Sequence, residues 1–404
     1  MTRGRLAALG TGALALAVLA SCGGDDDGGS DTPAPAPTVS ALPSPTASAS
    51  PAPLPSPTAT STGAVRRTNV ATFDNPWAMA FLPDGRLLVT EKAGTLRLVT
   101  TAGVVTSVSG LPAVAAGGQG GLLDVALDPG HAGNRRVWWS YAEAGSGGKG
   151  LAVARGTLTI AADGRGSLSD VTVVWRQDPK VSGDGHFGGR IAFSPDGKLF
   201  VTAGERQQGS PAQDLTKTLG KVIRLNLDGS VPADNPFTGT AGAKGEIWSY
   251  GHRNPYGLVF ADDGRLFESE MGPEGGDEFN LVRRGANYGW DAVSEGSRYG
   301  GAAYPRHATN PAVAAPLVSW TPVISPGGMI QYRGTMFAGW DGDFVLAGLT
   351  AQGLVRVRVT GGGASEVARI PLGARIREVE QAPDGAIFVL EDGAGGRLIR
   401  LDPA

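Results

Sequence analysis

The chain has 404 residues, of which 18% are charged and 41% are hydrophobic, and its formal net charge is −3. This balance is typical of a soluble globular protein, and it excludes the basic surface that nucleic-acid binding requires. The 63 glycines and 28 prolines follow no collagen-like period, so they indicate a fold with many turns.

Residues 1–21 have the pattern of a lipoprotein signal peptide. Two early arginines precede an apolar run of small residues that is too short for a stable membrane span, and the run ends in Leu-Ala-Ser-Cys. This tetrapeptide resembles a bacterial lipobox, which implies cleavage before Cys22 and acylation of its thiol. A plain secretory signal with an accidental cysteine is the alternative. Cys22 is the sole cysteine, so the exported domain contains no disulfide.

Residues 22–64 are rich in Asp and then in Pro, Ala, Ser and Thr, with almost nothing to bury. Such a composition predicts a disordered tether. We therefore expect an exported protein that is lipid-anchored to the bacterial cell envelope through Cys22, with residues 65–404 as its folded domain.

Six segments of this domain share one hairpin pattern, in which a turn precedes an alternating strand. The four clearest copies are FLPDGRLLVTE from Phe81, FSPDGKLFVTAGE from Phe193, FADDGRLFESE from Phe260 and QAPDGAIFVLED from Gln381. Weaker copies begin at Ala126 and Tyr332. Six copies predict an all-β fold, a six-bladed β-propeller of four-stranded antiparallel blades. A β-solenoid is the competing architecture, but its repeats would be shorter and more regular.

Charged and polar residues recur beside these hairpins, where a propeller would direct them to one mouth of its channel. His186 precedes one copy and Glu205 follows it, while Arg375 and Arg377 alternate along a strand that leads into the last copy. Each residue alone has an ordinary explanation, such as a loop histidine bonded to a backbone carbonyl or a solvated strand face. Their common placement is what favours a functional site.

The segments GQGGLLDVALDP, HFGGRIAFSPDGKLFVTAGE, GHRNPYGL, ESEMGPEGGDEFNLVRRGANYGW and RIREV together resemble one family. This is the family of soluble aldose and glucose dehydrogenases that depend on pyrroloquinoline quinone (PQQ), six-bladed propellers that include sorbosone-dehydrogenase-like proteins. The resemblance extends over nearly all of residues 65–401. It implies oxidation of aldose sugars at C1 to lactones, with electrons passed to a membrane-associated acceptor.

The resemblance also implies roles for individual residues of the catalytic centre. His186 matches the general base, Arg253 belongs to the same centre, and Glu205 stands where the family has an aspartate against the histidine. We expect Glu205 to orient the ring and to raise the pKa of His186 by stabilising the imidazolium. Gln119 matches a residue that lines the sugar site, although a glutamine closing a Gly-rich turn is an alternative.

PQQ is a planar tricarboxylate, so a net-acidic chain needs a local group of cations to hold it. By resemblance these contacts come from Arg253, Asn254, Arg375 and Arg377, with Trp320 as an aromatic wall. One family lysine has no counterpart, because Thr350 stands in the corresponding loop.

A calcium ion beside the cofactor would take the carbonyl oxygens of Gly272 and Pro273, by the same resemblance. The nearby Asp277 and Glu278 are interpreted as solvated charges or as groups behind those ligands. Two other functions stay open from the residues alone. One is a calcium-dependent hydrolase of lactonase type, which requires a ring of acidic and Asn ligands, and the other is a non-catalytic sugar-binding or scaffold propeller.

Overall fold

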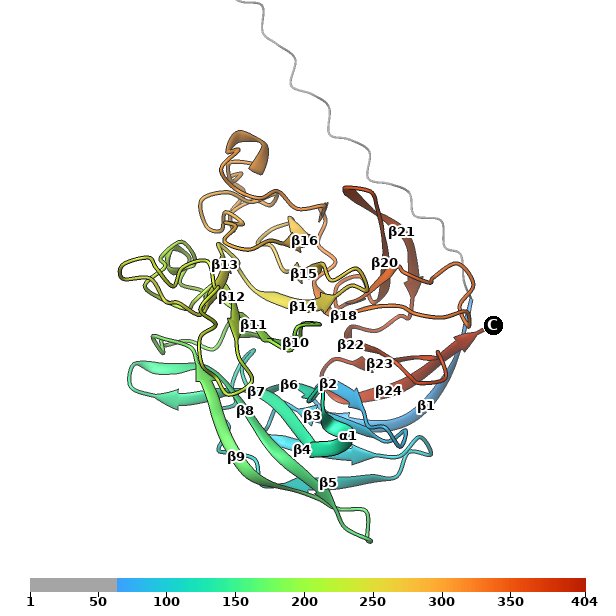
Figure 1. The fold of residues 1–404 in the computed structure, drawn as a ribbon. Coiled ribbons are helices and arrows are strands. Elements are labelled where there is room, and N and C mark those ends of the chain that lie inside the picture. Colours follow the sequence, from blue (N-terminus) through green and yellow to red (C-terminus); the bar gives the residue numbers. More distant parts are fainter. Residues whose placement is uncertain (1–63) are drawn as a thin grey trace, which may run out of the picture. The chain divides into compact units, whose positions relative to one another are not determined.

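The computed structural model describes residues 64–404, and the predicted signal peptide, Cys22 and tether up to residue 63 lie outside the described residues. Residues 65–403 contain 24 strands, arranged as six four-stranded antiparallel blades around a central axis (Figure 1). The predicted all-β, six-bladed propeller is confirmed. Among residues 64–404 no helix is long and apolar enough to cross a membrane.

The strands of the first three blades follow one another along the chain. Blade 1 contains β2 (Pro76–Phe81), β3 (Leu87–Glu91), β4 (Thr95–Val99) and β5 (Val105–Ser109). Blade 2 contains β6 (Leu122–Leu127), β7 (Arg136–Gly145), β8 (Gly148–Ile160) and β9 (Gly166–Arg176). Blade 3 contains β10 (Gly188–Phe193), β11 (Leu199–Ala203), β12 (Lys221–Leu225) and β13 (Ile247–Tyr250).

The remaining blades repeat this order until the last strand of the ring. Blade 4 contains β14 (Pro255–Phe260), β15 (Leu266–Glu270), β16 (Asp277–Val282) and β17 (Val318–Trp320). Blade 5 contains β18 (Pro326–Gln331), β19 (Phe344–Gly348), β20 (Gly353–Thr360) and β21 (Gly363–Pro371). Blade 6 contains β22 (Ile376–Gln381), β23 (Ile387–Glu391), β24 (Ala394–Pro403) and, from the start of the domain, β1 (Val65–Asp74).

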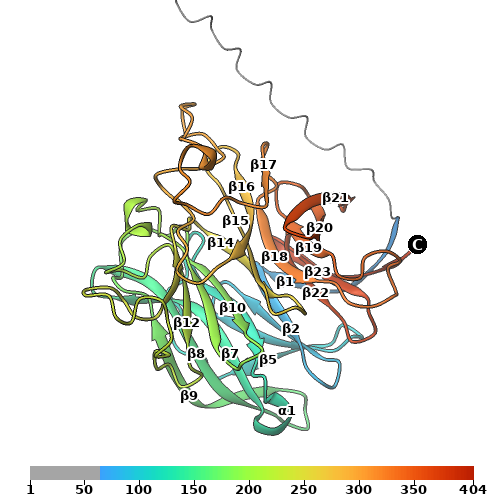
Figure 2. The same ribbon diagram turned by 45° about the horizontal axis from the view of Figure 1, so that its top comes forward.

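The six hairpin copies found in the sequence all connect the inner strand of a blade to its second strand. In the four clear copies the turn glycine donates its N–H to the carbonyl three residues earlier at 2.9 Å; these glycines are Gly85, Gly197, Gly264 and Gly385. Their φ angles lie between 75° and 92°, a region that L side chains rarely occupy, which explains the Asp-Gly pattern. The weaker copy from Ala126 carries a short helix, α1 (His131–Asn134), at its turn (Figure 2). Two 3-10 turns, η1 (Ser210–Ala212) and η2 (His307–Thr309), lie in longer loops.

The ring is closed by pairing between the two ends of the domain. Strand β1 pairs antiparallel with β24, so that Val65 lies opposite Pro403 and Phe73 opposite Gly396. No local feature of the sequence indicates this closure. A short parallel pairing of β5 with β9 also joins blades 1 and 2 at their outer edges.

The hydrophobic core lies between neighbouring blades rather than within them. One cluster joins blades 4 and 5 through the stacked rings of Phe267 and Phe279 against Phe344. Another joins blades 1 and 6 through Phe81 and Phe388, whose centroids are 5.1 Å apart. Each blade therefore holds its neighbour in place, and the loops at the ends of the inner strands are presented on a rigid frame.

Candidate functional site

Most of the predicted site residues, Trp320 excepted, lie at one end of the ring of inner strands. The C-terminal halves of all six inner strands line a cavity of about 580 Å³ at the opposite end. Their N-terminal ends must therefore meet at the other mouth, and the predicted residues are found there. His186 comes just before β10, Arg253 and Asn254 come just before β14, and Arg375 comes just before β22.

A cavity of about 180 Å³ opens at this mouth. Gln119, Arg375 and Arg377 line it, together with Lys92 and the rings of Trp77 and Tyr256. The two rings meet edge to face, with centroids 5.6 Å apart. Three of the residues predicted from the sequence thus share one cavity with an aromatic wall.

His186 is connected to this cavity through Gln119. The backbone N–H of His186 donates to Oε1 of Gln119 at 2.7 Å. The ring nitrogen Nδ1 is bonded to Oε1 of Glu205, and the second carboxylate oxygen accepts the backbone N–H of Gly209 at 2.5 Å. With Nδ1–H donating to a carboxylate, Nε2 is left as a proton acceptor. The histidine and its carboxylate therefore form the pair that general-base chemistry requires.

The environment of this pair decides its charge. Burial lowers the pKa of His186 below its ordinary value, and the positive Arg253 adds to this effect, while the hydrogen bond that His186 donates to Glu205 opposes it without reversing it. The expected rise in the pKa of His186 is therefore wrong. The residue is only 6% exposed, and its loss of hydration outweighs the contribution of Glu205. For Glu205, burial raises the pKa, but the contacts with His186 and Gly209 outweigh it and the net shift is downward. At neutral pH the pair is a neutral imidazole beside a carboxylate.

The loop that carries His186 is held in a strained conformation. The φ of His186 is 48°, in the left-handed region, where strain is found mostly at functional positions. Gly204 makes this possible, since a Cβ on it would lie 2.2 Å from the carbonyl oxygen of His186.

The side chain of Arg206 holds the same loop in place through hydrogen bonds to its backbone. Its guanidinium donates to the carbonyls of Gly185 at 2.9 Å and Gly183 at 2.5 Å, and it lies 3.6 Å from the ring centroid of Phe187. The side chain of Arg206 is 1% exposed, and burial lowers its pKa to about 10. Sequence reasoning missed this residue, because nothing local distinguishes a buried clamp from a surface arginine.

Arg253 and Asn254 lie next to His186 and Glu205. The carbonyl of Arg253 accepts the N–H of Glu205 at 2.9 Å, and Oδ1 of Asn254 accepts the N–H of Gly188 at 3.2 Å. Among the described residues, Nε of Arg253 and Nδ2 of Asn254 have no hydrogen-bond acceptor although both are buried. A buried donor without an acceptor is costly, so these two atoms point to an oxygen-rich ligand.

Two of the positively charged side chains that line the cavity, Arg375 and Arg377, already form ion pairs with a carboxylate. Asp392 accepts from Nε of Arg375 at 3.0 Å and from Nη2 of Arg377 at 2.8 Å. Lys92 is a further cation in the cavity that was not predicted; its Nζ donates to the carbonyl of Gly118 at 2.6 Å, and burial followed by the charge of Arg377 lowers its pKa.

A signal for Lys92 was nevertheless present in the sequence. Lys92, Met271 and Asp392 each stand seven residues after a turn glycine of a hairpin copy, at the end of the second strand. Lys92 and Met271 line the cavity, and Asp392 bonds to the two arginines that do. Aligning the copies by their glycines would have placed all three at this mouth.

Comparison with known proteins shows the family of this chain. The sequence profile of the family described as "Glucose / Sorbosone dehydrogenase" matches residues 73–400. The aldose sugar dehydrogenase YliI of Escherichia coli (strain K12) is 41% identical over 339 residues, which cover 82% of this chain and 90% of that protein. The chain belongs to the glucose/sorbosone dehydrogenase family.

Solved structures support the family assignment. The soluble aldose sugar dehydrogenase of Escherichia coli, crystallised in the apo form, has a TM-score of 0.81 and 38% identity, covering 84% of this chain and all of that one. The PQQ-bound aldose sugar dehydrogenase of Streptomyces coelicolor has a TM-score of 0.70 and 29% identity, over 86% of this chain and all of that one. Quinoprotein glucose dehydrogenase B of Acinetobacter calcoaceticus is 30% identical over 282 residues, 60% of this chain and 55% of that protein.

The predicted metal-binding turn at Gly272 is held by hydrogen bonds to the side chains of Arg253 and Asp277. The carbonyl of Gly272 accepts from Nη1 of Arg253 at 2.8 Å, and its N–H donates to Oδ1 of Asp277 at 2.9 Å. Asp277 also accepts the N–H groups of Ile324 and Ser325, and it is 1% exposed. Asp277 is therefore a buried group that holds the Gly272–Pro273 turn, and the alternative of a solvated charge is wrong. Glu278 is also buried, at 6% exposure.

Trp320 is not brought to the cavity. Its ring is 5% exposed in the core between blades 4 and 5, and Nε1 donates to Oε2 of Glu366 at 2.7 Å. This position does not fit the predicted aromatic wall of a quinone site. Thr350 lies next to Leu349 of the cavity, and its hydroxyl is 2.6 Å from Oγ of Ser325. The aromatic surface at the mouth comes instead from Trp77 and Tyr256.

Proposed function

We propose that this protein is a PQQ- and calcium-dependent aldose sugar dehydrogenase that oxidises the C1 hydroxyl of aldoses to lactones. The observation that carries the proposal is the His186–Glu205 pair, which is connected through Gln119 to a cavity lined by Arg375 and Arg377. The family assignment favours this function over a lactonase-type hydrolase and over a non-catalytic propeller.

The residues at the mouth fit a planar anionic cofactor. The unpartnered Nε of Arg253 and Nδ2 of Asn254 can donate to its oxygens, while Arg375, Arg377 and Lys92 supply positive charge for its carboxylates. The carbonyl oxygens of Gly272 and Pro273 are hard donors of the kind that calcium takes. When bound, PQQ supplies the two-electron acceptor for the C1 hydride, and calcium supplies a Lewis acid beside it.

The chain's own residues supply the proton transfer. Nε2 of His186 accepts the proton of the C1 hydroxyl, and loss of this proton together with the C1 hydride leaves the lactone carbonyl. Glu205 holds Nδ1–H, so that the ring presents Nε2, and its charge stabilises the imidazolium that forms. Gln119 accepts the backbone N–H of His186 through Oε1 and lines the cavity, and its amide nitrogen would donate to a sugar hydroxyl.

Reconstitution tests this function directly. Purified protein without cofactor is titrated with PQQ in the presence of calcium and assayed with a dye acceptor against a panel of aldoses. We expect activity only when both PQQ and calcium are present, and lactone as the product. A fully loaded protein that oxidises no aldose would overturn the proposal, whereas lactone hydrolysis without PQQ would support the hydrolase instead.

We also propose that the protein is exported and anchored to the cell envelope by lipid on Cys22, close to a membrane-associated electron acceptor. The support is the lipobox-like Leu-Ala-Ser-Cys that ends the apolar run of residues 1–21. Cys22→Ser is expected to move the protein from the membrane fraction to the soluble fraction of its bacterial host, as measured by immunoblotting. If the variant fractionates like the wild type, lipidation is not the anchor.

A further inference from the structure

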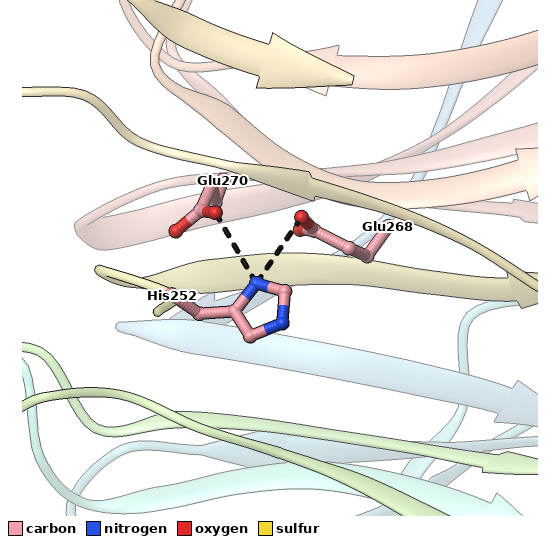
Figure 3. Close-up of side chains that lie close together, drawn as sticks. All are labelled: His252, Glu268 and Glu270. Atoms are coloured by element: carbon pink, nitrogen blue, oxygen red, sulfur yellow. Dashed lines mark hydrogen bonds and ion pairs between the residues drawn. The ribbon is translucent and has the colours of Figure 1, made fainter. Parts of the chain in front are cut away.

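Three buried side chains meet directly behind the loop that carries Arg253. His252 follows β13, and Glu268 and Glu270 both lie in β15 (Figure 3). The exposed fractions of His252, Glu268 and Glu270 are 0%, 0% and 4%. Figure 3 shows both carboxylates turned toward Nδ1 of His252, and one ligand atom from each residue lies within 4.8 Å of the other two. The proposed sugar oxidation uses none of these three side chains.

We propose that His252, Glu268 and Glu270 bind a divalent transition-metal ion, with zinc as the best match. The donor set is one imidazole nitrogen and two carboxylates, which zinc accepts and which is too soft at the nitrogen for calcium. The proposal concerns an ion separate from the calcium expected at Gly272, because the ligands are different atoms.

The distances distinguish a metal from a shared proton. Nδ1 of His252 is 3.3 Å from Oε1 of Glu270 and 3.6 Å from Oε1 of Glu268. A charge-assisted hydrogen bond between imidazolium and carboxylate is shorter, about 2.7–2.9 Å. Ligand atoms at about 2.0–2.1 Å from a tetrahedral zinc ion are separated from each other by about 3.3 Å. The 3.3 Å separation from Glu270 matches that of two ligands around a tetrahedral ion and is long for a charge-assisted hydrogen bond, and the 3.6 Å separation from Glu268 is slightly longer still.

The contacts around the three residues are those of metal ligands. Nε2 of His252 lies 2.8 Å from Oγ of Ser249, and Oε1 of Glu268 accepts from Asn280 at 2.8 Å. Hydrogen bonds of this kind, made by groups that do not contact the metal, orient metal ligands. Oε2 of Glu268 is buried and has no hydrogen-bond donor among the described residues. An ion bound by both oxygens of Glu268 would satisfy Oε2, which a proton on His252 leaves unpaired.

Charge balance points the same way. Without an ion, burial lowers the pKa of His252, but the contacts with Glu268 and Glu270 outweigh it and raise the pKa to about 9. With an ion at Nδ1 the ring would be neutral, with Nε2–H donating to Ser249, and the three buried residues would carry a charge of −2. A divalent ion neutralises this charge, whereas one proton on His252 removes only half of it.

The ion would stabilise the loop that carries Arg253 and Asn254. Oε2 of Glu270 accepts the backbone N–H of Arg253 at 2.5 Å and that of Asn254 at 3.2 Å. A metal on the other oxygen of Glu270 would hold this carboxylate in place, and with it the two backbone groups that set the positions of Arg253 and Asn254.

Metal analysis of the purified protein without PQQ tests the proposal. Protein produced in zinc-supplemented medium is freed of loosely bound metal and analysed by inductively coupled plasma mass spectrometry. We expect about one zinc per chain, reduced at least tenfold in Glu268→Gln. The matched control is Glu366→Gln, which removes a buried carboxylate that is held by Arg369 and Trp320 and is expected to keep its zinc.

A second measurement covers the case in which Glu268→Gln does not fold. Anomalous diffraction of wild-type crystals at the zinc edge is expected to show a peak at about 2.1 Å from Nδ1 of His252. Zinc-free protein is expected to unfold at a lower temperature than zinc-loaded protein, since only the folded state binds the ion. Less than about 0.1 zinc per chain, or a zinc peak elsewhere with none at His252, would overturn the proposal. It would then follow that His252 is held as an imidazolium between the two carboxylates.

Discussion

The two sides of the channel mouth are built in different ways. On blade 3, His186 is buried, strained and bonded through Nδ1 to Glu205, with Arg206 closing the loop from below. On blade 6, the side chain of Arg375 is 51% exposed and that of Arg377 13% exposed, and both are paired with Asp392.

This difference separates two tasks of the site. A general base needs a geometry that exists before the sugar arrives, because a misplaced proton acceptor costs rate. Arginines that bind a tricarboxylate must exchange Asp392 for the ligand, at least in part, and their partial exposure leaves them free to do so. The blade 3 side is therefore expected to control turnover, and the blade 6 side to control cofactor affinity.

The largest expected effect comes from removing the base. His186→Ala is predicted to lower kcat of the reconstituted enzyme by about 10²–10⁴-fold, the range for loss of a positioned general base, with little change in PQQ affinity. Steady-state kinetics and a PQQ titration on the same preparation measure both quantities. His131→Ala, which changes a histidine of α1 bonded to the carbonyl of Arg136, is the control and should retain full activity. Unchanged kcat in His186→Ala would contradict the mechanism.

A smaller effect is expected on the cofactor side. Arg377→Ala is predicted to weaken PQQ binding by about 1.5–3 kcal/mol, the range for a charge-assisted hydrogen bond, while kcat at saturating PQQ changes little. Arg375→Ala should weaken it less, because solvent screens a half-exposed charge. Arg66→Ala is the control for loss of positive charge, because Arg66 lies in β1, the edge strand of blade 6, and is paired with Asp402. Titration of PQQ by fluorescence compares the three variants, and equal affinities would assign both blade 6 arginines to a solvated face.

The smallest effect is a shift in pH dependence. Activity should rise with pH as His186 loses its proton, and burial places this rise below the ordinary pKa of histidine. Glu205→Gln removes the contact that opposes this lowering, so the rise should move to still lower pH, with a slower plateau rate than wild type. The pH profile of kcat measures the shift. A rise that moves to higher pH in Glu205→Gln would mean that the carboxylate is not the partner of the base.

Features set by local chemistry could be predicted from the sequence. The Asp-Gly turns require glycines with positive φ, so the hairpins at Gly85, Gly197, Gly264 and Gly385 were recognisable one by one. Their repetition gave the number of blades. The resemblance then named His186, Glu205 and Gln119, which the structure connects through direct hydrogen bonds.

Features set by long-range packing could not be predicted. An aromatic residue in a strand has the same local pattern whether it faces a ligand or a core, so Trp320 was placed wrongly. The burial of Asp277 depends on backbone groups of residues 324 and 325, more than 40 residues away. The net direction of the pKa shift of His186 depends on burial, which the sequence does not show.

The pairing of β1 with β24 has a consequence for how the chain acquires its structure. Val65 and Pro403 are partners, so the last blade cannot be completed until nearly the whole domain has been synthesised. Contacts of such long sequence separation form slowly, because the loop that they close is long. During synthesis the first five blades can associate with their neighbours, but the ring stays open and β1 has no partner until β24 has been made. Closure by the N-terminal strand is therefore the step that converts a stack of blades into a finished site.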